Sequence, residues 1–123
     1  MVAQRFSHLL VENVEGVLVV KFKNGKMTDH DEVEDSGTQL FSLIQDGVKI
    51  IVNLENVTYL DDGLTGKLMC LHKRISNAKG VVIFCNINEL VLERLALKKF
   101  TKLFTITKSI QEALQQITQN HVK

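Results

Sequence analysis

The sequence predicts an α/β fold in which a mixed β-sheet is covered by amphipathic helices. Short runs of apolar, β-branched residues recur along the chain, and longer segments with helical periodicity separate them. A chain of 123 residues, 45% hydrophobic and 24% charged, is expected to form one domain spanning residues 1–123. The predicted order of elements is β-β-α-β-α-β-α-β-α.

The amino-terminal part predicts a β-hairpin followed by a helix. Residues 8–22 read as two short strands that meet at Glu15 and Gly16. Residues 31–45 then have a helical pattern, and Gly47 is placed to end that helix. The apolar stripe of the helix consists of Val33, Leu40, Phe41 and Ile44.

The middle of the chain predicts two buried strands with a helix between them. Residues 48–54 and 81–85 are continuous apolar runs, which are typical of strands buried on both faces of a parallel sheet. The helix begins after Asp61 and Asp62 and is closed by the turn at residues 77–80. Its apolar face is formed by Leu64, Leu68, Leu71 and Ile75.

The carboxyl-terminal part predicts two more helices around a short strand. Residues 88–100 form the first, with Asn88 as its N-cap. A strand at residues 103–106 follows, and the last helix starts at Ser109 with Glu112 completing a capping box. The sheet is therefore expected to be mainly parallel, with the opening hairpin as an antiparallel edge.

The charge balance excludes some classes of function. Fifteen Lys and Arg against fourteen Asp and Glu give a net charge of +1, which gives no reason to expect nucleic-acid binding. No apolar run approaches the roughly 18 residues of a membrane-spanning helix, and no secretory signal is recognisable. We expect a cytoplasmic protein that does not contact membranes.

Metal and catalytic motifs are missing from the sequence. The acidic run near residue 30 fails as a calcium loop, because counting from Asp29 places Glu34 at the position that needs glycine and Leu40 at the position that needs glutamate. The four histidines lack metal-ligand spacing, and no serine stands in a nucleophile motif. Cys70 and Cys85 are interpreted as reduced core thiols. We expect no metal, no cofactor and no enzymatic activity.

Asp61 and Asp62 stand together at the strand-to-helix joint and have several interpretations. Capping of the helix explains one carboxylate, but a second adjacent one adds repulsion. A phosphoacceptor site of the response-regulator type would need an acidic pair after the first strand, and the sequence has none. A small anion or nucleotide at the helix start is an alternative function, although two carboxylates there repel anions. A partner-binding surface is the remaining interpretation.

The segment IIVNLENVTYLDDGLTGKLMCLHKR, residues 50–74, resembles the STAS domain family, named for sulfate transporters and anti-sigma factor antagonists. The resemblance extends over nearly the whole chain and implies a STAS-like fold. It also implies a non-enzymatic regulator of transcription in bacteria. In the antagonists of this family, an anti-sigma factor with serine-kinase activity docks at this loop and phosphorylates the first Ser of an Asp-Ser-Ser-Gly pattern.

The resemblance also assigns positions. Asp61 matches the family's Asp, Asp62 stands where the phosphorylated Ser is expected, and Gly63 replaces the second Ser. Serine phospho-control at this position is therefore not expected. The implied partner is an anti-sigma factor, a serine-kinase-like protein or another signalling protein, and a homodimer is compatible with the sequence. The implied partner-binding residues are Thr28, Asp61, Asp62, Gly63, Leu64 and Thr65.

Overall fold

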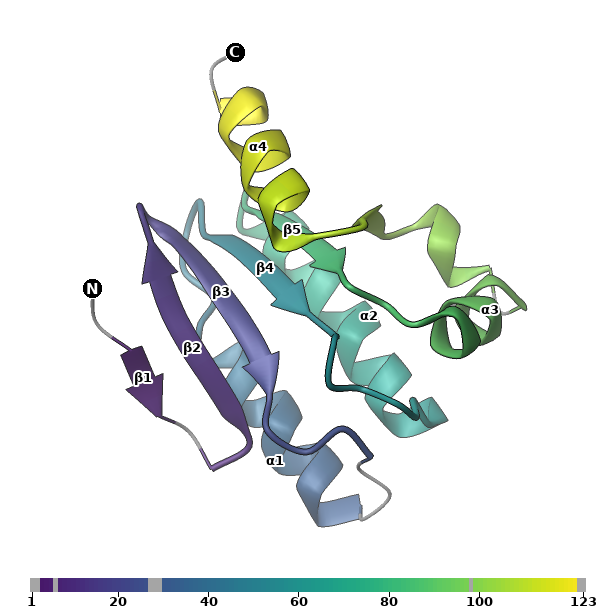
Figure 1. Ribbon diagram of the computed structural model, residues 1–123. Coiled ribbons are helices and arrows are strands. Elements are labelled where there is room, and N and C mark those ends of the chain that lie inside the picture. The colour runs from purple at the N-terminus through teal and green to yellow at the C-terminus, as the bar shows by residue number, and fades with distance from the viewer. Residues whose placement is uncertain (1–2, 6, 27–29, 98, 122–123) are drawn as a thin grey trace.

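A six-stranded sheet forms the centre of the molecule (Figure 1). The computed structural model describes residues 3–5, 7–26, 30–97 and 99–121. The strands lie in the sheet in their order along the chain. They are β1 (Ala3–Arg5), β2 (Leu9–Val14), β3 (Val17–Phe22), β4 (Lys49–Asn53), β5 (Val81–Cys85) and β6 (Thr105–Thr107).

The sheet is mixed, as the sequence predicts. Strands β1 to β3 pair antiparallel, and β3 to β6 pair parallel. The predicted hairpin is confirmed, with Glu15 and Gly16 at its turn, both at positive φ (53° and 87°). The sequence analysis missed β1, whose three residues have no apolar alternation and join the sheet through backbone pairing with β2.

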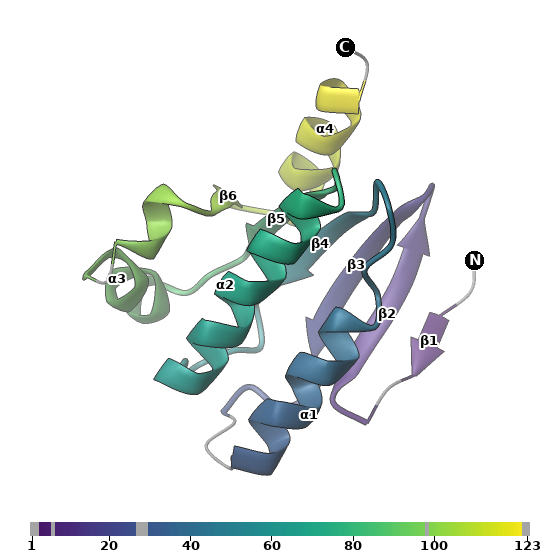
Figure 2. The same ribbon diagram turned by 180° about the vertical axis from the view of Figure 1, so that it is seen from behind.

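The described residues form four α-helices. They are α1 (His30–Phe41), α2 (Asp62–Asn77), α3 (Glu89–Leu97) and α4 (Ile110–His121), and a short 3-10 helix, η1 (Phe100–Lys102), follows α3. Helices α1 and α2 lie side by side on one face, and α4 lies on the other (Figures 1 and 2). Helix α3 lies beyond β5, off the edge of the sheet, and buries Val91 and Leu95 against the core on the α1 and α2 side.

The two cores explain why the central strands are apolar throughout. Alternate residues of a strand point to opposite faces, so Ile50 and Val52 of β4 join the core under α1 and α2. Ile51 joins the core under α4, where it meets Ala113 and Ile117. Within the described residues, no helix is long and apolar enough to cross a membrane.

Several element boundaries differ from the predictions, and one of them is the helix expected at residues 88–100, which ends at Leu97. The strand expected at residues 103–106 is found at Thr105–Thr107, and Phe104 before it stacks on Phe84 with ring centroids 4.4 Å apart. The helix expected to reach residue 45 ends at Phe41 and tightens into a turn, in which the Leu43 N–H bonds the carbonyl of Leu40.

Cys70 also differs from its interpretation as a core residue. Its side chain is exposed on α2, whereas Cys85 is buried at the end of β5. Position 70 falls outside the spacing of the apolar face of α2, which explains its exposure. Burial raises the pKa of the Cys85 thiol to about 11, and the charge of Glu55 adds to this shift. Cys85 is therefore an unreactive core thiol.

Candidate functional site

The joint between β4 and α2 is built around Asp61. Its backbone is extended (φ −83°, ψ 174°), and its Oδ1 accepts a hydrogen bond of 2.8 Å from the Leu64 N–H. The Asp61 carbonyl accepts the first helical bond, from the Thr65 N–H at 3.0 Å. Asp61 is thus the N-cap, which stabilises a helix by about 0.5–2 kcal/mol. This accounts for one of the two adjacent carboxylates.

Asp62 is the first residue of α2, and its side chain is exposed. A carboxylate in the first turn lies near the positive end of the helix dipole, an interaction of roughly 0.3–1 kcal/mol. Asp62 is therefore an accessible negative charge next to an N-cap that is already in place. Its position on the surface agrees with a role in binding, and capping does not require it.

Two of the predicted contact residues, Leu64 and Thr65, are buried. Leu64 is 0% exposed and Thr65 is 3% exposed. The Thr65 hydroxyl donates a 2.7 Å hydrogen bond to the Asp61 carbonyl. These side chains hold the helix start in place and present no surface to a partner in this conformation. Thr28, the sixth predicted residue, lies outside the described residues.

Two exposed glycines lie on the first turns of α2. A Cβ at Gly63 would meet Val33 at 3.4 Å, an ordinary contact, and a Cβ at Gly66 would meet nothing within 4 Å. Neither glycine has positive φ. Glycine inside a helix costs roughly 0.5–1 kcal/mol relative to alanine. Neither internal space nor backbone conformation requires these residues to be glycine.

The loop that leads to the joint, residues 54–60, is held by its neighbours. The Thr58 N–H donates to the Gly25 carbonyl at 2.9 Å, and the Asn88 side chain donates to the Val57 carbonyl at 3.1 Å. A Cβ at Gly25 would collide with the carbonyl of Asn56, so only glycine permits this approach. The loops after β3, β4 and β5 therefore form one connected edge.

A second set of polar residues, which the sequence analysis missed, ties the ends of the same three strands. Asn53 is 1% exposed, and its side chain donates to Glu55 at 2.9 Å. Its Oδ1 accepts from the Asn86 side chain at 3.1 Å. The Lys21 ammonium lies 3.1 Å from the Glu55 carboxylate. The Asn53 hydrogen bond and then Lys21 lower the pKa of Glu55.

This polar network holds the loop after β4 to the ends of the neighbouring strands. Asn86 has positive φ (56°), a conformation that asparagine tolerates better than most residues and that accompanies its bond to Asn53. An asparagine at the end of each of two apolar runs, Asn53 after residues 50–52 and Asn86 after residues 81–85, was the available sequence signal. The pairing of Asn53 with Asn86 spans 33 residues, so periodicity within either segment could not predict it.

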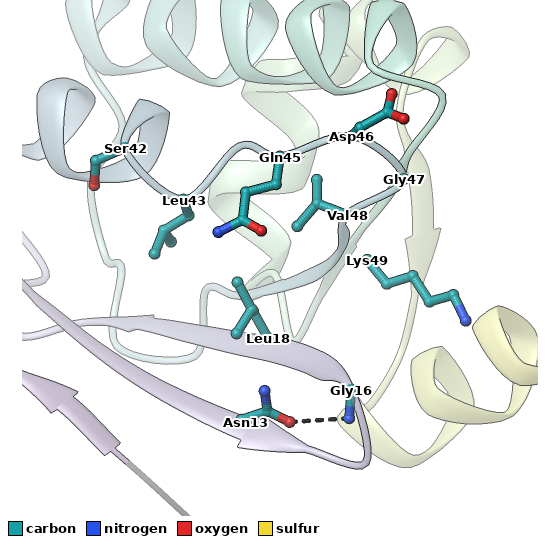
Figure 3. Close-up of a pocket in the computed structure, with 10 residues that line it drawn as sticks. All are labelled: Asn13, Gly16, Leu18, Ser42, Leu43, Gln45, Asp46, Gly47, Val48 and Lys49. Carbon is teal, nitrogen blue, oxygen red and sulfur yellow. Dashed lines mark hydrogen bonds between the residues drawn. The ribbon is translucent and has the colours of Figure 1, made fainter.

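A cavity of about 570 Å³ lies at the other end of these strands, beside the starts of β3 and β4 (Figure 3). It opens between the β2–β3 turn and the segment before β4, and it includes none of the predicted site residues. Leu18, Leu43 and Val48 line its interior, while the Lys49 side chain points away toward α4. Over the described part of the chain, no cluster of three His, Cys, Asp or Glu side chains could hold a metal ion.

The fold and the joint can be compared with known proteins. A family model for the STAS domain matches residues 8–113. The chain belongs to the STAS domain family. A search of curated proteins gave no match. Solved structures of similar fold include a STAS domain protein from Planctomyces limnophilus, described as an anti-sigma factor antagonist. It has 21% identity and a TM-score of 0.81, and the match covers 89% of this chain and 97% of that chain.

Two further structures have the same fold. A putative anti-sigma factor antagonist from Thermotoga maritima has 21% identity and a TM-score of 0.74, over 88% of this chain and 92% of that chain. The Bacillus cell fate determinant SpoIIAA, solved in its phosphorylated form, has 17% identity and a TM-score of 0.65, over 89% of this chain and 98% of that chain. These similarities show that the present chain has the fold of these proteins.

Proposed function

We propose that this STAS domain is a non-catalytic regulator that binds an anti-sigma factor of the serine-kinase type, or a related signalling protein, at the start of α2. The docking surface consists of Asp62, Gly63 and Gly66, the exposed residues of the first turns. Asp61, Leu64 and Thr65 support it from beneath. The names of the similar structures, which include anti-sigma factor antagonists, support this partner class.

The two glycines carry the proposal. Each costs helix stability, and neither is required by its surroundings in the chain. A partner that packs against the backbone of α2 would explain why both residues are glycine, because a side chain at either position would keep that partner away from the backbone. The rigid attachment of residues 54–60 to the neighbouring loops presents this surface in one conformation, which reduces the entropy lost on binding.

Asp62 gives the docking surface a permanent charge. In the family pattern this position is the phosphorylated serine, and phosphoserine carries about −1.5 to −2 at neutral pH against about −1 for aspartate. The related fold of SpoIIAA exists in a phosphorylated form. We propose that the present domain has one binding state where its relatives have two. The Thr65 hydroxyl is buried, so it does not restore phosphate control.

The proposal is tested by titrating anti-sigma factors of the kinase type with the wild-type domain and three variants in a calorimeter. Gly66→Arg should abolish binding, because the side chain projects from the docking surface. Ser76→Arg, at the exposed far end of α2, is the matched control and should bind like wild type. Asp62→Ser should become a substrate for phosphate transfer from ATP, detected by mass spectrometry. Equal binding by both arginine variants would refute the docking surface.

A further inference from the structure

Helix α3 exposes an apolar stripe that no other part of the described chain covers. Leu90 is 76% exposed and Leu97 is 81% exposed, although Val91 and Leu95 of the same helix are buried. Leu90 and Leu97 are two turns apart and therefore lie on one face. Both views show the outer side of α3 pointing away from the sheet (Figures 1 and 2). Large apolar side chains grouped in this way indicate an interaction surface.

The charged residues of this stripe make it complementary to itself. Glu93 and Arg94 are exposed and lie between the two leucines on the same face. Consider an antiparallel pair of α3 helices whose two-fold axis passes midway between residues 93 and 94. Each residue of one copy then faces the residue of the other copy that lies equally far from this midpoint in the opposite direction along the sequence. Leu90 of one copy then faces Leu97 of the other, and Glu93 faces Arg94.

We propose that a second copy of this chain covers the outer stripe of α3, defined as Leu90, Glu93, Arg94 and Leu97, in a two-fold antiparallel dimer. A two-fold interface must be self-complementary, and this stripe satisfies that condition in both its apolar and its charged members. In the sequence the pattern continues to Glu89 and Lys98, the second of which lies outside the described residues. An unrelated partner would not require this symmetry.

Arg94 already has a contact within its own chain. Its guanidinium carbon lies 5.6 Å from the centre of the Tyr59 ring. A cation over an aromatic ring uses the face of the guanidinium, and its N–H groups lie at the edge. The edge remains suited to the Glu93 carboxylate of a second copy. The short length of α3, nine residues, implies a small interface and hence a weak dimer.

The dimer is independent of the proposed partner, and sedimentation velocity from micromolar to millimolar concentration tests it. The wild-type chain should shift from monomer to dimer. Leu97→Glu should raise the dissociation constant at least about tenfold, the equivalent of 1.4 kcal/mol. Leu10→Glu is the matched control, because Leu10 is also an exposed leucine (44%) but lies on β2, far across the sheet. A wild-type chain that stays monomeric, or a dimer unaffected by Leu97→Glu, overturns the proposal.

Charge exchange tests the antiparallel register. Glu93→Arg and Arg94→Glu should each weaken self-association, because each places like charges opposite one another. A mixture of these two variants should form heterodimers, and the double variant E93R/R94E should recover the wild-type dissociation constant. Failure of both the mixture and the double variant to recover dimerisation would exclude the two-fold pairing, whatever the outcome of the docking experiment.

Discussion

The start of α2 exposes backbone, whereas the outer stripe of α3 exposes apolar side chains. At α2 the leucine of the first turn, Leu64, is fully buried and glycines occupy the surface. At α3 the relation is reversed, since Leu90 and Leu97 stand in solvent. The two helices are neighbours along the chain, so the difference shows two ways of making a surface available. In our proposals, the lack of side chains at α2 allows a partner to approach the backbone, and the exposed leucines of α3 provide apolar area for association.

The comparison predicts that replacing a leucine by alanine lowers the free energy of unfolding far more in α2 than in α3. Leu64→Ala should lower the free energy of unfolding by about 2–5 kcal/mol, because it leaves a cavity in the core. Leu97→Ala should change it by no more than about 0.5 kcal/mol, because the side chain is 81% exposed. Urea unfolding of dilute protein measures both. A similar loss in the two variants would mean that Leu97 is packed against the same chain.

Asp61 and Asp62 provide the next test, within the joint itself. Asp61→Ala should lower the free energy of unfolding by about 0.5–2 kcal/mol, since it removes the hydrogen bond to the Leu64 N–H. Asp62→Ala should cost less, about 0.3–1 kcal/mol for its interaction with the helix dipole, because the N-cap hydrogen bond belongs to Asp61. Thermal unfolding monitored by circular dichroism gives the comparison. If Asp62→Ala lowers the free energy of unfolding as much as Asp61→Ala does, Asp62 stabilises the helix start. Its charge would then no longer support a role in docking.

The parts of this fold that depend on local patterns were predictable from the sequence. Hairpin, parallel strands and helices follow from apolar spacing. Residue type beside a helical pattern predicts that one of Asp61 and Asp62 caps α2, and the structure gives that role to Asp61. The pattern could not say that Leu64 belongs to the interior, because a residue on an apolar stripe at a functional loop suits either role. It also could not reveal the pairing of Asn53 with Asn86, or that Leu90 and Leu97 of α3 remain exposed. Those features depend on which segments meet in space.

A substitution at Gly66 should affect the stability of the protein and its binding to a partner in opposite directions. Gly66→Ala should raise the free energy of unfolding by about 0.5–1 kcal/mol, because alanine favours the helix and a Cβ meets nothing within 4 Å. The same variant should bind the partner more weakly, as its methyl group keeps the partner from the backbone. Chemical unfolding and calorimetry on one preparation measure the two effects. A variant that is more stable and binds as tightly as wild type would show that the glycine is not retained for docking.

The smallest expected effect is the loss of stability at acidic pH that comes from Glu55, which is held by Asn53 and Lys21. The pKa of Glu55 is lowered from 4.5 in the folded protein, so its charge stabilises the fold above about pH 4.5 and that contribution disappears as pH falls through the folded pKa. Glu55→Gln should therefore lose less stability on acidification than wild type. Lys21→Gln should raise the pKa of Glu55 only part of the way, since the Asn53 hydrogen bond, the largest single cause of the lowered pKa, remains. NMR titration of the Glu55 carboxyl distinguishes the two. A complete return to the ordinary pKa in Lys21→Gln would show that Asn53 does not hold the loop through this carboxylate.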